Sequence, residues 1–275
     1  MHNTVADTAI ETRVQVAAYL NRKATVNYLD WLSLENPGAY HSDILKNRSP
    51  YTGQWFLQSS EYELWRSRKH QTLFCPGIPG AGKTMIMAIV IDDLVSRYHD
   101  HKDVAIAWIY YDFRRRGSQG LEQILGSLLR QLTSRCLAVP ECIMVLHEKH
   151  EHFKTQPSYT ELMEVLDDIL ASFSHVYIVI DALDECLVEG DQRTLPGALS
   201  KLQGNARVSL IATSRHIPDI KASFSGQPSL EISAAPEDLA AYLEDKLHQF
   251  PMSIQADTEL HREIQSHLIS TCQGM

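Results

Sequence analysis

At 275 residues, the chain is long enough for one large α/β domain with extensions and a substantial buried core. Its apolar and charged fractions, 44% and 21%, are ordinary for a soluble globular protein, so composition indicates this class and nothing finer. The formal net charge of -9 argues against a broad nucleic-acid-binding surface, which needs an excess of Lys and Arg, and we expect no nucleic acid partner.

Other features of the whole chain favour a cytoplasmic protein. The first residues include Asp7 and Glu11 and no apolar signal-peptide core. The longest apolar runs, such as Met85 to Ile91, fall well short of the roughly 18 residues of a membrane span. The cysteines form no CxxC pair and no zinc-ligand spacing, which favours free thiols. We expect the one dense basic cluster, Arg114 to Arg116, to be a solvated loop.

The first predicted element is helical and runs from Thr8 to about Leu34, where Asn36, Pro37 and Gly38 break the pattern. A turn-rich stretch from Lys46 to Trp55 then leads into the main domain. The boundary is expected near Pro50. Residues 1–50 are therefore interpreted as an N-terminal helical segment and linker.

The main domain alternates short β-branched apolar runs with longer helical patterns, which is typical of a parallel sheet covered by crossover helices. We predict an α/β fold with a five-stranded parallel sheet flanked by helices over residues 51–234. The strands are expected at Thr72–Cys75, Val104–Tyr111, Val176–Ile180, Val208–Ala212 and Leu230–Ile232, and the helices at Lys83 to about Arg97, Leu121–Arg135, Glu141–His152 and Tyr159–Phe173.

Beyond the last predicted strand, Pro236 marks a helix start, and Leu239, Tyr242 and Leu243 recur at helical spacing. A further amphipathic stretch follows before the chain ends at Met275. Residues 235–275 are interpreted as the start of a C-terminal helical lid.

The segment GIPGAGKT fits the P-loop pattern GxxxxGK[ST], directly after the apolar run LFC and directly before a helix. Its backbone N–H groups and the following helix are expected to bind the phosphates of a nucleoside triphosphate, while Lys83 contacts the β and γ phosphates and the Thr84 hydroxyl ligates Mg²⁺. Glycine abundance alone produces such a match in about one chain in a hundred of this length. The residues expected to bind nucleotide are Gly77, Ile78, Pro79, Gly80, Ala81, Gly82, Lys83 and Thr84.

Carboxylates follow the apolar run VYIVI, which reads as a buried strand ending at Asp181. Because ligands of α/β sheets bind at the carboxyl ends of strands, Asp181 is assigned to the Mg²⁺ site with Thr84. Asp184 and Glu185 begin the next loop, where a carboxylate orients or deprotonates the attacking water. Without the P-loop, the same acidic cluster would more often be the first turn of a helix.

The run VSLIATSR ends another strand at Arg215, where a cation reaches the γ-phosphate and registers its presence. A solvated strand end is nearly as good an interpretation of Arg215 taken alone. The histidine-rich stretch HEKHEH, from His147 to His152, is not an HExxH zinc motif. We interpret it as a solvated helix in which His147 and Glu151 form a weak ion pair.

Six stretches together resemble the NACHT-type, nephrocystin 3-like N-terminal module of fungal NOD-like receptor (STAND) proteins. They are TGQWFL at Thr52, TLFCPGIPGAGKT at Thr72, YYDFRR at Tyr110, VIDALDEC at Val179, IATSRHIPDI at Ile211 and LEISAAPEDLAAYL at Leu230. The resemblance implies a P-loop NTPase of the additional-strand class, in which the fourth strand lies between the P-loop strand and the strand of Asp181. That order brings Arg215 close to Lys83 and Asp181.

The resemblance also implies that ATP, or GTP as the alternative, and Mg²⁺ act as a conformational switch with slow hydrolysis and nucleotide-dependent self-association. It suggests signalling in self/non-self recognition or programmed cell death. Family members continue into a winged helix and a repeat array, so the lid that begins at residues 235–275 is interpreted as truncated.

Two other classes of function remain open. One is a nucleotide-binding scaffold without turnover, against which the complete set of catalytic-type residues argues mildly. The other is a small-molecule kinase, for which no acceptor-binding pattern is found. A signalling GTPase normally carries an NKxD-like motif after a strand, and ATSRH at Ala212 to His216 does not provide one, so adenine is favoured.

Overall fold

The computed structural model describes residues 23–35, 37–111, 120–186, 195–246, 259–260, 262–264 and 266–267. The chain divides into two compact units, one of residues 1–35 and 120–172 and the other of residues 36–119 and 173–275. Arg114 to Arg116 and the first part of the predicted N-terminal helix lie outside the described residues.

The smaller unit is helical in its described part. A helix over residues 23–32 is joined by α6 (Leu121–Arg135), α7 (Glu141–Glu151) and α8 (Tyr159–Leu170), close to the predicted bounds. The helix over residues 23–32 is tied to α6 because Arg130 donates to Asp30 at 2.8 Å and to the Ser33 carbonyl oxygen at 2.6 Å. Apolar faces of α6 and α8 pack together, as the buried side chains Leu125, Leu128 and Leu166 show.

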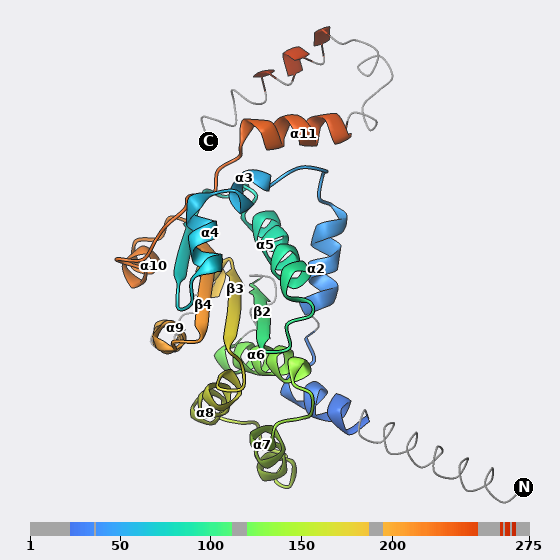
Figure 1. Ribbon diagram of the computed structural model, residues 1–275, viewed down its shortest axis with the longest axis vertical. Helices are drawn as coiled ribbons and strands as arrows, with labels where there is room; N and C mark the ends of the chain where they lie inside the picture. The colour runs from blue at the N-terminus through green and yellow to red at the C-terminus, as the bar shows by residue number, and fades with distance from the viewer. Residues whose placement is uncertain are drawn as a thin grey trace, which may run out of the picture. The chain divides into compact units, whose positions relative to one another are not determined.

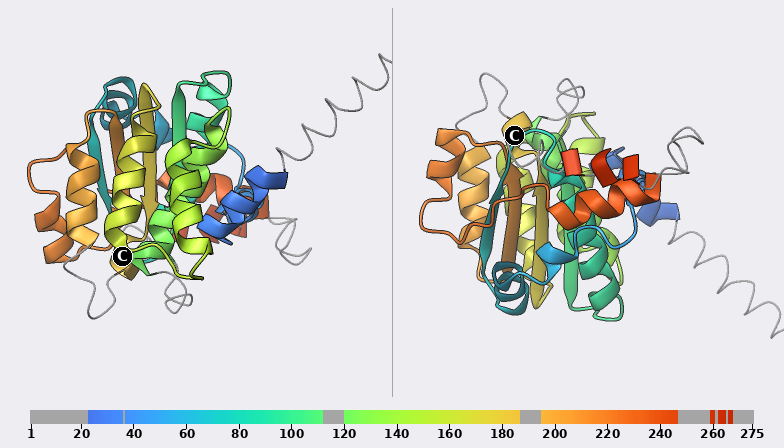
Figure 2. Two further views of the ribbon diagram at one scale, coloured as in Figure 1. Left: turned by 90° about the horizontal axis from the view of Figure 1, so that it is seen from below. Right: turned by 90° about the horizontal axis from the view of Figure 1, so that it is seen from above.

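The larger unit is built on a parallel sheet of β1 (Thr72–Pro76), β2 (Val104–Tyr110), β3 (His175–Asp181) and β4 (Val208–Ser214). The strand order is β1-β4-β3-β2, and Figure 2 shows the four strands side by side. The fourth strand therefore lies between the P-loop strand and the strand of Asp181, as the family resemblance implies. This order brings the carboxyl ends of three strands together at one edge of the sheet.

The predicted fifth strand, Leu230–Ile232, is wrong, because the described residues form a sheet of four strands. The segment nevertheless runs along the free edge of β1, where Leu230 N donates to Phe74 O at 3.0 Å and Ile232 N donates to Pro76 O at 2.7 Å. The ladder is incomplete because Pro76 has no N–H to donate back to this segment. Only an isolated bridge between Phe74 and Ser229 is formed.

Helices of the larger unit cover the sheet and carry the segments around the P-loop. In Figure 1, α2 and α5 lie side by side, and they are in contact. Of these helices, α5 and α11 were predicted, whereas α2, α3, α4, α9 and α10 were not. The helix α2 begins at Pro37, because the proline that was read as a helix break occupies the first helical position, where it is tolerated. The helices are α2 (Pro37–Lys46), α3 (Gln54–Leu57), α4 (Ser60–Ser67), α5 (Lys83–Tyr98), the 3-10 turn η2 (Leu183–Cys186), α9 (Leu195–Gly204), α10 (Pro218–Ser223) and α11 (Pro236–Lys246).

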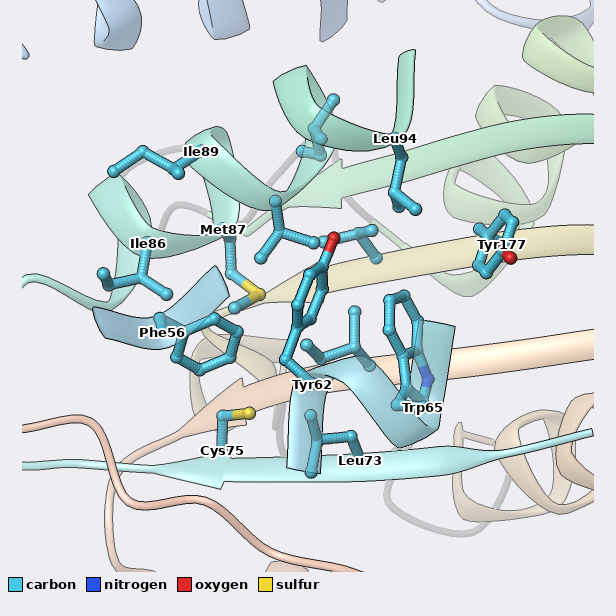
Figure 3. Packing of buried hydrophobic residues seen from close by; sticks show 14 of the residues in the cluster. Phe56, Tyr62, Trp65, Leu73, Cys75, Ile86, Met87, Ile89, Leu94 and Tyr177 are labelled. Carbon is cyan, nitrogen blue, oxygen red and sulfur yellow. The ribbon is translucent and has the colours of Figure 1, made fainter. Parts of the chain in front are cut away.

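An aromatic core joins α4 and α5 to the sheet. Figure 3 shows Phe56, Tyr62 and Trp65 between α5 and the strands, with Leu73 and Cys75 of β1 below them. Trp65 is 2% exposed, and its indole Nε1 donates to Leu210 O of β4 at 2.9 Å. Since strand residues alternate between the two faces, Phe74 points to the opposite face, where it stacks on Phe224 after α10 at 4.7 Å.

Acidification is expected to destabilise the larger unit through His175 at the start of β3. His175 is 7% exposed and contacts the Ser209 hydroxyl at 2.9 Å. Burial lowers the pKa of His175 to about 4 from its ordinary 6.5, and the charge of Lys69 adds to this effect. The pKa of His175 is lower in the folded protein than in the unfolded chain. Its contribution to stability is therefore fully present above pH 6.5 and is lost as the pH falls toward 4.

Between pH 7 and pH 5 this histidine should reduce the free energy of unfolding by about 1–2 kcal/mol. Urea titrations of the wild type and His175→Gln at both pH values measure the difference, since Gln keeps a polar partner for Ser209 but does not titrate. An equal acid loss in both proteins would contradict the prediction.

Candidate functional site

A cleft of about 490 Å³ opens at the carboxyl ends of β1, β3 and β4. It contains most of the predicted P-loop residues together with the predicted metal-ligand and catalytic side chains. Its lining residues are Ile44, Pro79, Gly80, Gly82, Lys83, Thr84, Met85, Asp181, Ala182, Asp184, Glu185 and Arg215.

The P-loop connects β1 to α5 and has the backbone of an anion-binding turn. Gly80 and Gly82 have φ angles of 81° and 86°, in the left-handed region that favours glycine. Gly82 is also the N-cap of α5 and supplies no side-chain cap, so N–H groups of the first turn are left for a ligand. The positive end of a helix of 16 residues then points into the cleft.

Lys83 folds back onto its own loop. Its Nζ donates to Gly77 O and to Ile78 O, both at 2.8 Å. Burial lowers the pKa of Lys83, whereas the nearby carboxylates of Asp184 and Asp181 raise it. The ammonium group is thus held at the loop by two carbonyl oxygens, which a phosphate group is able to replace as partners.

Asp181 lies at the end of β3 between two threonines. Thr84 Oγ1 of α5 and Thr213 Oγ1 of β4 each donate to it at 2.6 Å. The side chain is almost fully buried, and burial raises the pKa of Asp181 although both hydroxyl hydrogen bonds lower it. A cation at this position would offset that desolvation cost.

Oxygen donors at Thr84 and Asp181 fit Mg²⁺, which is usually held by one or two protein ligands together with phosphate oxygens and water. Across the part of the chain that the structure describes, no group of three or more His, Cys, Asp and Glu side chains could hold a metal ion. A divalent cation held by these two residues would complete its coordination with water or with the phosphate oxygens of a ligand.

Asp184 and Arg215 form a pair beside this centre. Arg215 donates its backbone N–H to Asp184 Oδ1 at 2.9 Å, and its Nε–H donates to Asp184 Oδ2. The Asp184 side chain is 2% exposed, whereas that of Arg215 is 50% exposed. Both oxygens of Asp184 are thus used to hold Arg215 at the end of β4, while the neighbouring Glu185 lines the cleft.

A sharp turn places these carboxylates. Ala182 has a φ angle of 57°, which is uncommon for a residue with a side chain, and it is followed at once by η2. Its backbone N–H donates to Thr213 Oγ1 at 2.9 Å, so Thr213 bridges the turn and Asp181. The turn brings Asp184 and Glu185 back to the cleft instead of leading the chain away.

Sequence patterns missed one wall of the cleft. Ile44 comes from α2, and Met85 from the first turn of α5. The helix α2 is fixed on the sheet by His41, whose Nδ1 lies 2.8 Å from the Tyr110 hydroxyl oxygen at the end of β2. The break assigned at residues 36–38 hid this helix, and its apolar spacing was the signal that could have found it.

The histidine-rich stretch is helical, and its expected solvent exposure holds for Glu148, Lys149, Glu151 and His152 but not for the half-buried His147 or the buried His150. His147 packs against Tyr28 and Trp31 at ring distances of 4.8 and 4.9 Å, and His150 is 7% exposed. The predicted contact of His147 with Glu151 is confirmed at 3.3 Å. Aromatic packing onto the helix over residues 23–32 buries these side chains, which helical spacing alone does not reveal.

No helix in the described ranges is long and apolar enough to cross a membrane. Cys75, Cys136 and Cys142 are free thiols, and burial raises the pKa of the Cys75 thiol beyond its ordinary range.

Comparison with known proteins gives a family match and one curated relative. Residues 51–215 match the sequence model of the family described as Nephrocystin 3, N-terminal. The chain is 24% identical over 242 residues to the vegetative incompatibility protein HET-E-1 of Podospora anserina, in an alignment that covers 80% of this chain and 17% of that protein. The chain therefore corresponds to less than a fifth of the relative's length.

Solved structures resemble the chain more distantly. Cdc6p from Pyrobaculum aerophilum is 16% identical with a TM-score of 0.46, covering 72% of this chain and 50% of that one. The Orc1 protein of Aeropyrum pernix in complex with DNA is 20% identical with a TM-score of 0.45, covering 65% of this chain and 44% of that one.

Proposed function

The chain belongs to the nephrocystin 3 N-terminal family, and from this premise we propose that it binds Mg²⁺-ATP in the cleft, hydrolyses it slowly and uses the exchange as a conformational switch. The observation that carries the proposal is the meeting of three strand ends. The P-loop after β1, Asp181 of β3 and Arg215 after β4 line one cleft, and the family match includes all three segments.

In this proposal the triphosphate lies along the loop from Gly77 to Thr84. Backbone N–H groups around Gly80 and Gly82 donate to phosphate oxygens at the start of α5. Lys83 exchanges the carbonyl oxygens of Gly77 and Ile78 for the β and γ phosphates. Mg²⁺ would be held by Thr84 and Asp181, and when bound it neutralises charge on the phosphate oxygens.

The two carboxylates after Asp181 receive different roles. Glu185 lines the cleft, so it is assigned to orient the attacking water and accept its proton. Asp184 is assigned to position Arg215, because both of its oxygens already accept hydrogen bonds from that residue. The half-exposed guanidinium group then contacts the γ-phosphate and stabilises the charge that develops there.

A switching role is favoured over rapid turnover by the family resemblance. The relative in Podospora anserina is a vegetative incompatibility protein, and we extend self/non-self signalling and programmed cell death to this chain as part of the proposal. Nucleotide-dependent self-association and a cytoplasmic location belong to it as well. In this scheme residues 1–50 form the N-terminal segment, 51–234 the nucleotide-binding core and 235–275 the start of a lid.

Equilibrium titration of the wild-type protein with fluorescent ATP, ADP and GTP analogues, with Mg²⁺ and with EDTA, tests the proposed function. We expect saturable adenine-nucleotide binding that weakens at least tenfold when Mg²⁺ is removed, because one cation contact is worth about 1.4 kcal/mol or more. Failure of all three nucleotides to bind with Mg²⁺ present would refute the proposal.

Single-turnover hydrolysis by Glu185→Gln tests the catalytic assignment. Loss of the carboxylate should slow hydrolysis about 100-fold while ATP affinity stays within about twofold, because Gln keeps the shape but accepts no proton. The matched control is Glu63→Gln, an exposed residue of α4. Equal hydrolysis rates in wild type and Glu185→Gln would remove Glu185 from catalysis, whereas nucleotide binding without any hydrolysis by the wild type would favour a scaffold.

A further inference from the structure

The helix α11 is docked by carboxylates instead of by a buried apolar face. None of its described residues from Pro236 to Lys246 is fully buried. Asp238 and Asp245 are seven residues apart, so they lie on the same side of the helix, two turns from each other. Both contact residues 49–55, here called the 49–55 loop, whose last two residues are the first two of α3 (Figure 1).

Asp238 makes the more extensive of the two attachments. Both of its carboxylate oxygens accept the backbone N–H of Gly53, at 3.0 and 2.9 Å, and Oδ2 also accepts the indole Nε1–H of Trp55 at 3.1 Å. Two turns further along α11, Asp245 Oδ2 accepts a hydrogen bond from the hydroxyl of the buried Ser49 at 2.8 Å. The same oxygen lies 2.9 Å from Lys246 Nζ.

The opposite side of the 49–55 loop rests on the helix that follows the P-loop. A Cβ atom at Gly53 would lie 2.4 Å from Ile89 Cδ1 and 3.2 Å from Ile86 Cδ1, both in α5. The loop therefore lies between α11 and α5. If α5 moves when phosphate binds at its first turn, the 49–55 loop would transmit the displacement to the carboxylates of α11.

A second connection reaches the P-loop itself. Ile232, four residues before α11, donates its N–H to Pro76 O at 2.7 Å. Its carbonyl oxygen lies against the first glycine of the P-loop, since a Cβ atom at Gly77 would be 2.4 Å from Ile232 O. The chain leading into α11 is thus packed against the residue at which the nucleotide loop begins.

We propose that α11 is a releasable latch, closed by Asp238 and Asp245 on the 49–55 loop and coupled through α5 and Gly77 to the occupancy of the P-loop. Its polar attachment suits release, because water is able to replace the lost hydrogen bonds and none of the described residues of α11 is fully buried. Asp238 and Asp245 are positioning residues that act on the nucleotide site from outside it. The part of the inference that concerns nucleotide rests on the proposed function.

Hydrogen exchange of the nucleotide-free protein, followed by mass spectrometry, tests the latch without any ligand. Asp238→Asn should raise amide exchange about 5–10-fold in residues 236–246, around Gly53 and in residues 77–84, because an Asn side chain cannot accept all three hydrogen bonds. Asp245→Asn should give the same pattern with a smaller change. The matched control, Glu244→Gln, removes an exposed charge from the same helix and should leave exchange unchanged.

Release of a fluorescent ADP analogue tests the coupling. Asp238→Asn should speed release about 5–10-fold, and Mg²⁺-ATP should alter exchange in α11 of the wild type, because coupling between two sites is reciprocal. Unchanged exchange in α11 for both Asp variants, with β3 exchanging as in wild type, would overturn the latch. Faster exchange in α11 with unchanged exchange in residues 77–84 and unchanged ADP release would overturn its coupling to the P-loop.

The test also distinguishes failure of the inference from failure of the proposed function. If the wild type binds no nucleotide, the proposed function falls, and exchange in residues 77–84 of the nucleotide-free variants still decides whether the latch reaches the P-loop. A rise there supports the inference, and no change overturns it.

Discussion

Lys83→Ala is expected to weaken ATP binding about 100-fold. A hydrogen bond to a charged group contributes about 1.5–3 kcal/mol, and Lys83 would make such contacts with the β and γ phosphates in the proposed complex. In the free protein the same ammonium group is held by Gly77 O and Ile78 O, so part of the gain is offset by loss of those two bonds. Isothermal titration calorimetry with Mg²⁺-ATP measures the effect.

The control for this prediction is Lys46→Ala. Lys46 ends α2, its side chain is 70% exposed, and it pairs with Asp43 on the surface, so ATP affinity should stay within about twofold of wild type. Equal affinities of Lys83→Ala and wild type would show that the nucleotide is not bound along the loop from Gly77 to Thr84.

Trp65→Ala should reduce the free energy of unfolding of the larger unit by about 3–5 kcal/mol, the usual cost of truncating a buried aromatic side chain. The indole ring packs between Tyr62 and Tyr177, at ring distances of 5.6 and 5.4 Å. Its loss also leaves Leu210 O of β4 without the indole donor. Urea unfolding followed by far-ultraviolet circular dichroism gives the difference without depending on tryptophan fluorescence.

The neighbouring residue provides the comparison. Leu64 lies in the same helix and is 48% exposed, so Leu64→Ala should cost less than about 1 kcal/mol. Similar losses of unfolding free energy for Trp65→Ala and Leu64→Ala would mean that the face of α4 that carries Trp65 does not hold this helix on the sheet. Trp65→Phe should fall between them, because it keeps apolar packing but not the hydrogen bond to Leu210.

The P-loop and the four central strands could be predicted because their signals are local. A buried parallel strand reads as a short apolar run, as in VYIVI before Asp181, and GIPGAGKT requires a defined backbone between a strand and a helix. The strand ends were set one or two residues short at β3 and β4, where polar residues such as His175 and Thr213 continue the ladder while buried. The pattern of apolar residues cannot assign a polar residue to a buried strand, because it takes the first polar residue as the end of the strand.

The remaining features depend on contacts between distant segments. The fifth strand failed because Pro76 removes one hydrogen bond from the edge of β1, although Leu230 and Ile232 do run beside that edge. Nothing in the order of residues shows that Asp184 accepts from Arg215 or that Asp238 accepts from Gly53. Such pairs are fixed by strand order and helix docking, which are tertiary properties.

The position of β4 between β1 and β3 also sets the timing of assembly during synthesis. The apolar strand β1 emerges early, yet the structure pairs it only with β4 and, through an edge contact, with the segment around Leu230, within the residues described. At a translation rate of about 5–20 residues per second, Val208 follows Pro76 from the ribosome by on the order of ten seconds. For that interval β1 has unpaired edges, and unpaired strand edges make a partly folded chain prone to aggregation.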